Sequence, residues 1–314
     1  MSRRFLVLIG PTRTGTTSLY RYLARDRTNF AASTIKETNA FLPPSGRRAG
    51  AGIEARTSRS DYLASFPSAA GDHVLLEASP LYFAAASSVA AGLRDALAGD
   101  DVRVLATLRE PVERFASLYR HVVTKRNVKE DPVPFETFVH DALAARDELG
   151  NANRADANRH AFNEGRYSEL LMAWSNALGA DRVRAASFDA LADDEARSDT
   201  LHALYAWLGL EDEGHLATPY ITENRGRQVR AKGVHAAALR LNDRLEPLFN
   251  RLPWLRDAAR AVYYRANENR SATKEFAVAA MDDLRAAYTG ANADLAGTLR
   301  PLLLGPLPHW CQED

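Results

Sequence analysis

The stretch Phe5-Leu-Val-Leu-Ile-Gly-Pro-Thr-Arg-Thr-Gly-Thr-Thr-Ser-Leu-Tyr20 decides how the chain begins to fold. It opens with an apolar run of the length of a buried strand and ends in a helical pattern. Gly10 and Gly15 have the spacing of the glycines in G-x-x-x-x-G-K-S/T, a loop that binds nucleotide phosphates between a strand and a helix. Thr16 stands where that motif has its lysine, and Thr17 fills its hydroxyl position.

The loop offers an anion several donors even without the lysine. Backbone N–H groups between the glycines point inward, and the following helix presents its positive N-terminal end. Thr16, Thr17 and Ser18 add hydroxyl groups, and Arg13 adds a positive charge within the loop. We therefore expect residues 13–18, which include Thr14 and Gly15, to bind a phosphate; the alternative is a plain strand–turn–helix with polar turn residues.

The missing lysine disfavours a nucleoside triphosphatase, in which that lysine reaches the β- and γ-phosphates. The apolar run His73–Glu77 also ends in glutamate, where such an enzyme has a magnesium-binding aspartate. A ligand with one 5′-phosphate and a less charged transferring group, such as a phosphosulfate, suits the loop better.

Further apolar, β-branched runs alternate with helical patterns, which is typical of a parallel sheet with helical crossovers. Glycine-rich or proline-rich stretches at Pro43–Arg59 and Val128–Pro134 indicate loops. No repeat or low-complexity linker divides the chain, so we predict one α/β domain over residues 1–314, with a doubly wound, mainly parallel sheet flanked by helices. The predicted strands are Phe5–Ile9, His73–Glu77, Val102–Leu108 and Val183–Phe188, and the predicted helices are Thr16–Arg25, Pro111–Thr124, Phe135–Ala145, Ser168–Ala177, Arg197–Leu208, Val234–Leu248 and Glu275–Leu303, the last with a turn near Gly290.

Composition excludes several classes of protein. Forty basic side chains balance forty acidic ones, so no global charge favours nucleic acid as a partner. Cys311 is the single cysteine, which excludes a disulfide framework and a paired-cysteine metal site. The run Phe5–Ile9 is too short for a signal-peptide core or a membrane span, so we expect a cytoplasmic protein without a membrane span. The sequence leaves the oligomeric state open.

A second nucleotide motif lies at the end of the predicted strand Val102–Leu108. Arg109 follows that strand, and Ser117 lies two turns into a helix that opens near Pro111. The two side chains can converge on one anion. Alternatively, Arg109 pairs with a carboxylate and Ser117 caps the helix or faces solvent.

Together the two motifs resemble those of the sulfotransferases that use 3′-phosphoadenosine 5′-phosphosulfate (PAPS). Their phosphosulfate loop commonly reads P-K-x-G-T-T, and Arg13 occupies the place of its lysine. Their 3′-phosphate motif, L-R-D/N-P-x-E/D-R-x-x-S-x-Y, is closely matched by Leu108–Tyr119. The chain is also similar to the family at Gly165–Trp174 and in its last helices, and the similarity covers most of residues 5–310.

The resemblance, closest to the heparan-type carbohydrate branch, implies a P-loop-like sulfotransferase fold, PAPS as co-substrate and no metal. It implies that Arg109 and Ser117 hold the 3′-phosphate and that Arg13 is catalytic. Because arginine is a poorer proton donor than lysine, Arg13 would act by charge and hydrogen bonding on the bridging oxygen. A basic loop at residues 224–233 would cover the 3′-phosphate, and its candidate contacts are Arg227, Arg230, Lys232 and Gly233.

On the acceptor side, the segment Thr34–Phe41 resembles the family segment that carries the catalytic base. The resemblance implies that Glu37 is the base and that Lys36 helps to hold the sulfonate. Residues 77–82 resemble E-K-S/T-P-x-Y, which implies acceptor contacts at Glu77, Ser79 and Pro80, whereas Ala78 replaces a lysine that binds anionic acceptors. Glu77 and His121 are alternative bases.

We therefore predict a sulfotransferase that moves a sulfuryl group from PAPS to a hydroxyl, or an amine, of a carbohydrate or glycosylated small-molecule acceptor. Two alternatives remain. One is a metal-dependent small-molecule kinase with a degenerate phosphate loop, and the other is a non-catalytic nucleotide-binding protein.

Overall fold

The computed structural model describes residues 2–43, 58–66, 71–126, 133–146, 161–212, 214–222, 228–229, 268–269 and 276–311. Within them, five strands form one sheet, and two further strands of two residues pair antiparallel. The sheet strands are β1 (Arg4–Gly10), β2 (Phe30–Ala32), β3 (Val74–Ala78), β4 (Asp101–Leu108) and β5 (Val183–Ser187), and the small pair is β6 (Gln228–Val229) and β7 (Glu268–Asn269).

The sheet has the order β2-β3-β1-β4-β5, and all its neighbouring strands are parallel. β1 is central, and every residue from Phe5 to Gly10 is buried because helices cover both faces. After β1 the chain forms β2 and β3 on one side of β1. It then crosses to the other side, where it forms β4 and β5. In such sheets, ligands bind beyond the carboxyl ends of the strands at the point where the order reverses. The predicted doubly wound α/β fold is therefore confirmed.

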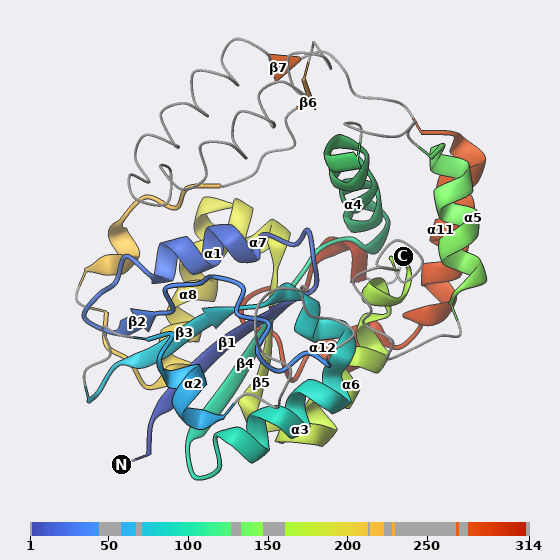
Figure 1. Ribbon diagram of the computed structural model, residues 1–314. Helices are drawn as coiled ribbons and strands as arrows, with labels where there is room; N and C mark the ends of the chain where they lie inside the picture. Colours follow the sequence, from blue (N-terminus) through green and yellow to red (C-terminus); the bar gives the residue numbers. More distant parts are fainter. Residues whose placement is uncertain are drawn as a thin grey trace.

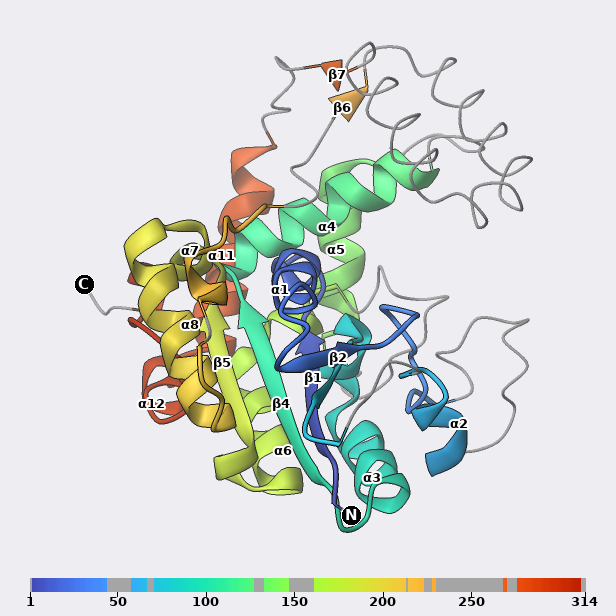
Figure 2. The ribbon, with the colours of Figure 1, turned by 90° about the vertical axis from the view of Figure 1, so that its left-hand side faces the viewer.

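Helices of moderate length cover the two faces (Figures 1 and 2). On one face, Leu6 and Leu8 pack with α1 and α8; on the other, Phe5 and Val7 pack with α3, α6 and α12. The bounds of these helices, and of α2 and α7, are α1 (Thr16–Leu23), α2 (Arg59–Leu63), α3 (Ala86–Ala96), α6 (Tyr167–Leu178), α7 (Phe188–Ala192), α8 (Asp194–Leu208) and α12 (Leu295–Leu299).

A separate apolar cluster lies beyond the carboxyl ends of the strands. It joins α4 (Pro111–Arg126), α5 (Phe135–Ala144) and α11 (Val278–Ala291), and it includes buried aromatic residues such as Phe115 and Phe138. Figure 1 shows these three helices to one side of the sheet. The cluster fixes α4, which carries Ser117 of the second nucleotide motif, against α5 and α11.

The structure differs from the sequence prediction mainly in short or weakly patterned elements. The four predicted strands are present within one residue at each end, but β2 was missed because it has three residues. α3 was missed because alanines, serines and a glycine dilute its apolar pattern. The helical region predicted over Glu275–Leu303 comprises α11 and α12, and the turn predicted near Gly290 is confirmed where α11 ends at Ala291.

Parts of the prediction lie outside the described residues, namely the helix Val234–Leu248 and most of the two loops. The assignment of residues 1–314 to one domain stays a prediction. Within the described part of the chain, no helix is long and apolar enough to cross a membrane.

Candidate active site

The phosphate loop joins β1 to α1 and depends on its two glycines. Gly10 has φ +95°, and a Cβ atom there would lie 2.5 Å from the carbonyl oxygen of Pro80, which follows β3. Gly15 has φ +87°, and a Cβ atom would lie 2.9 Å from the ring of Phe188, which follows β5. Positive φ and close contact together favour glycine at both positions. The loop is thereby seated between the ends of two other strands.

The N-terminus of α1 suits an anion. The helix begins after Gly15 without a side-chain cap, and its first turn holds no acidic residue. The first N–H groups of a helix have no partner within the helix, and the positive end of its dipole attracts negative charge. Thr16 is buried, and the half-buried Thr17 lies beside it. These residues fit the 5′-phosphosulfate group that the sequence predicted.

Two predicted hydroxyl ligands have other partners. The Thr14 hydroxyl donates to the carbonyl oxygen of Pro11 (2.6 Å) and lies 2.7 Å from the hydroxyl of Thr107 on β4. Ser18 is buried and hydrogen-bonds Tyr220. The side chains of Thr14 and Ser18 therefore stabilise the loop. The backbone N–H of Ser18 also has a partner, because it donates to the carbonyl oxygen of Gly15 at 2.9 Å.

Arg13 connects the two nucleotide motifs. Its backbone is left-handed (φ 70°), an uncommon conformation for a residue with a side chain. Its Nε donates a hydrogen bond to Ser117 Oγ on α4, at 3.3 Å across 104 residues of sequence. Ser117 is buried and thus neither caps α4 nor faces solvent. The structure brings together the loop cation and the serine of the second motif.

Three arginines converge around this contact. Burial lowers the pKa of Arg13, and the positive charges of Arg109 and Arg120 lower it further. Burial also lowers the pKa of Arg120, and Arg109 adds to the effect. Mutual repulsion of this kind is relieved when an anion binds between the guanidinium groups. Arg120 was not predicted from the sequence, although it lies three residues after Ser117 and hence on the same side of α4.

Arg109 has two neighbours of its own. It forms an ion pair with Glu113 at 2.9 Å and lies over the ring of Phe188, 4.8 Å from the centroid. This ion pair agrees with the alternative interpretation of the second motif, in which Arg109 pairs with a carboxylate. However, the Glu113 side chain is 59% exposed, and such surface pairs contribute about 1 kcal/mol or less. A phosphate can compete with this pair.

A buried acidic residue that the sequence analysis missed contacts the tip of the loop. Glu164 accepts hydrogen bonds from the N–H (3.3 Å) and the hydroxyl (2.5 Å) of Thr12. It also pairs at 3.1 Å with Arg114, which is fully buried. Nearby, the Tyr167 hydroxyl donates to the carbonyl oxygen of Arg109 at 2.7 Å and so fixes the end of β4.

Glu37 lies on the acceptor side, in the segment that follows β2. Its side chain is 46% exposed and pairs with Lys36 at 2.9 Å. The segment is attached on both sides of Glu37: the carbonyl oxygen of Lys36 accepts from Ala78 N–H at 3.2 Å, and the N–H of Asn39 donates to Ser79 Oγ at 3.1 Å. These contacts place an accessible carboxylate beyond the end of β3.

Glu77 is fully buried at the end of β3. It accepts hydrogen bonds from the hydroxyls of Thr38 and Ser79, each at 2.5 Å, and from the hydroxyl of Tyr62. Burial raises the pKa of Glu77, against the opposing effect of these hydrogen bonds. Ser79 and Pro80 are likewise buried. The arrangement favours a role in supporting the Glu37 segment over direct contact with an acceptor.

His121, the other alternative base, is half-buried on α4, one turn after Ser117. The side chains of the basic loop at 224–233, with Arg227, Arg230, Lys232 and Gly233, lie outside the described residues.

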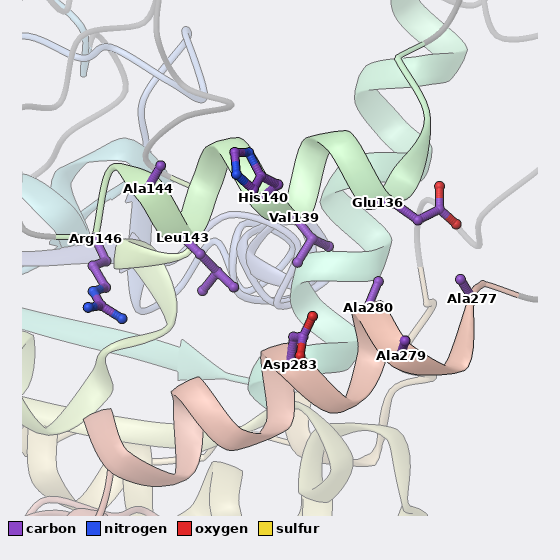
Figure 3. Close-up of a pocket in the computed structure, with 10 residues that line it drawn as sticks. All are labelled: Glu136, Val139, His140, Leu143, Ala144, Arg146, Ala277, Ala279, Ala280 and Asp283. Carbon is purple, nitrogen blue, oxygen red and sulfur yellow. The ribbon is translucent and has the colours of Figure 1, made fainter.

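In the part of the chain that the structure describes, no group of acidic, histidine or cysteine side chains is arranged to bind a metal ion. A groove of about 550 Å³ lies between α5 and α11, lined by residues such as Val139, His140 and Ala280. Figure 3 shows that its walls come from these two helices. None of the predicted site residues lines this groove.

Comparisons with known proteins support the resemblance. No family model matches the chain. The chain is 28% identical over 183 residues to the bifunctional heparan sulfate N-deacetylase/N-sulfotransferase 1 of Homo sapiens and to that of Mus musculus. The matched stretch covers 57% of this chain and 19% of each relative, so the chain corresponds to about a fifth of their length.

The structure is similar to that of a sulfotransferase from Alicyclobacillus acidocaldarius, with a TM-score of 0.54 and 22% identity. The similarity covers 81% of this chain and 96% of the other, and it concerns the fold. The resemblance to sulfotransferases inferred from the two nucleotide motifs is therefore confirmed, in sequence by the similarity to these relatives and in fold by the similarity to this structure.

Proposed function

We propose that the protein is a sulfotransferase that uses PAPS as donor and a hydroxyl or amine of a carbohydrate, or of a glycosylated small molecule, as acceptor. The observation that carries the proposal is the contact between Arg13 and Ser117, with Arg109 and Arg120 around it. A donor with a phosphate at each end of its ribose needs cations at two nearby positions. The loop supplies one position, and the end of β4 with α4 supplies the other.

The loop residues have separate tasks in this proposal. The N–H groups at the start of α1 and the Arg13 guanidinium hold the 5′-phosphosulfate and stabilise the charge that develops on the bridging oxygen. Arg109 and Ser117 hold the 3′-phosphate, with Arg227, Arg230, Lys232 and Gly233 as further candidates. Because a sulfuryl group carries less charge than a γ-phosphate, the reaction proceeds without the P-loop lysine and without a metal.

Glu37 is the proposed base. It accepts the proton of the attacking hydroxyl or amine while the acceptor atom bonds to sulfur. The bond between sulfur and the bridging oxygen breaks, and adenosine 3′,5′-bisphosphate leaves. Lys36, paired with Glu37 at 2.9 Å, is placed to hold a sulfonate oxygen.

A carbohydrate acceptor is supported by the name of the relatives, which act on heparan sulfate. Ala78 stands where heparan-type enzymes carry an anion-binding lysine, which favours an acceptor of low charge. The cytoplasmic location stays a prediction.

The test is incubation with sulfur-labelled PAPS in EDTA, with desulfated heparan oligosaccharides, which offer hydroxyls and amines, as acceptors. We expect label on the oligosaccharide and its loss in Glu37→Gln. Phosphoryl transfer from magnesium-ATP without any sulfuryl transfer would instead support the kinase. Nucleotide binding without turnover, unaffected by Glu37→Gln, would support the non-catalytic alternative.

A further inference from the structure

We propose that Glu164 is a positioning residue for Arg13 and acts on it through Thr12. This inference rests on the proposed function, in which Arg13 is the cation of the phosphosulfate loop. Glu164 lies 152 residues from Thr12 in sequence, in the turn that precedes α6. It is assigned no contact with the donor or acceptor.

Glu164 fixes the residue before Arg13. One carboxylate oxygen, Oε2, accepts from both the N–H and the hydroxyl of Thr12. An N–H of a phosphate loop would otherwise point at the anion. Because Glu164 accepts from the Thr12 N–H, this N–H does not take part in the anion site, which begins at Arg13. The same contact fixes the backbone direction at Thr12, the residue before Arg13.

The residue after Arg13 is also fixed. The Thr14 hydroxyl is buried between the carbonyl oxygen of Pro11 and the hydroxyl of Thr107. Arg13 between them has φ 70°, a conformation that is strained for a residue other than glycine. Such a conformation persists where the surrounding contacts enforce it, and it is often found in functional sites. Thr12 and Thr14 provide that enforcement on the two sides of Arg13.

Glu164 is itself held rigidly. Arg114 pairs with it from the fully buried side, and Arg114 also lies 3.4 Å from the Tyr288 hydroxyl on α11. Burial by itself lowers the pKa of Arg114, but Tyr288 and Glu164 outweigh this effect and raise the pKa, so that the charge is kept. The Tyr288 hydroxyl in turn donates to the carbonyl oxygen of Phe162 at 3.1 Å, two residues before Glu164.

The loop is thus attached to the α4–α11 layer through the buried pair, and not only to the sheet. This attachment keeps the Arg13 guanidinium beside Ser117 before a donor binds. Such preorganisation avoids the cost of moving the cation during the reaction. Loss of the attachment should therefore act on binding and turnover through Arg13.

The test is a double-mutant cycle of Thr12→Val and Arg13→Ala, because a cycle measures whether two residues act together. The first readout is the affinity for adenosine 3′,5′-bisphosphate by calorimetry, and the second is kcat. We expect Thr12→Val to reduce both by about ten- to a hundredfold, as small misplacements of catalytic groups do. Thr12→Ser, which keeps the hydroxyl, should restore both. In the Arg13→Ala background, Thr12→Val should have no further effect.

Thr289→Val is the matched control, since the Thr289 hydroxyl makes an exposed hydrogen bond within α11 (2.9 Å) away from the loop. If Thr12→Val fails to fold, Thr12→Ala takes its place in the cycle. Equal losses with and without Arg13, or no loss at all, would overturn the inference. Wild-type protein that does not bind the bisphosphate would refute the proposed function instead, so the two failures are distinct.

Discussion

Replacement of Gly10 by alanine tests the close contact between the phosphate loop and Pro80 at the end of β3. The new Cβ atom would lie 2.5 Å from the carbonyl oxygen and 2.7 Å from the Cα atom of Pro80. Both are backbone atoms, so no rotamer change relieves the contact. An alanine at positive φ costs about 1–2 kcal/mol, and overpacking of a well-packed site costs about 1–3 kcal/mol. We expect Gly10→Ala to lower the free energy of unfolding by about 1–5 kcal/mol, the sum of these two costs less the roughly 0.4–1 kcal/mol by which alanine restricts the unfolded chain.

Gly99 is a matched control because it has a similar backbone, φ +84°, and nothing within 4 Å of its Cβ position. Gly99→Ala should therefore lose stability only through the cost of alanine at positive φ. This loss is reduced by about 0.4–1 kcal/mol, because alanine also restricts the unfolded chain. Urea unfolding of both variants, compared at equal m-values, measures the difference. We expect Gly10→Ala to be the less stable by about 1–3 kcal/mol. Equal stability of the two variants would refute the close contact with Pro80.

Three further predictions concern single side chains. Arg120→Ala should weaken binding of adenosine 3′,5′-bisphosphate about tenfold, as loss of a hydrogen bond to a charged group does. Arg300→Ala, at the exposed end of α12, is the control and should weaken binding less. Equal losses in a calorimetric titration would mean that Arg120 acts only through net charge. Burial raises the pKa of Glu77 above its ordinary value of 4.5. The protonated side chain therefore stabilises the folded protein fully below pH 4.5, and this contribution is lost as the pH rises through the folded-state pKa. The stability of Glu77→Gln relative to wild type should therefore increase from pH 4.5 upward, by at most about 1.4 kcal/mol per pH unit, and a difference independent of pH in urea titrations would contradict this. Burial raises the pKa of Cys311 to about 12, so iodoacetamide at pH 8 should label it slowly in the native protein and quickly in urea; fast native labelling would show an accessible thiolate.

The sequence predicts the centre of the fold well because its signals there are local. β1 has a continuous apolar run, and β4 is buried without interruption from Val104 to Leu108, which is what burial on both faces of a parallel sheet requires. The glycine spacing of the loop and the step from Arg109 to Ser117 are also contained in short stretches. Both motifs lie where the strands end, as the sequence analysis expected.

Contacts between distant segments lie beyond such reasoning. Glu164 and Thr12 are 152 residues apart, and no local pattern connects them. Glu77 reads as an accessible carboxylate at a strand end, yet Thr38, Ser79 and Tyr62 enclose it. Arg120 was within reach of sequence analysis, because residues three apart on a helix share a side. Its closeness to Arg13 and Arg109 depends on how α4 packs, which the sequence does not show.

The central claim is that the cations around Arg13 and Ser117 bind a nucleotide with a 3′-phosphate. The most direct test is calorimetric titration with adenosine 3′,5′-bisphosphate in EDTA, and with ATP and magnesium, on wild type and Arg109→Ala. We predict tight, metal-independent binding of the bisphosphate that weakens at least tenfold in the variant, since a hydrogen bond to a charged group contributes about 1.5–3 kcal/mol. Preference for magnesium-ATP, with no difference between wild type and Arg109→Ala, would contradict the claim.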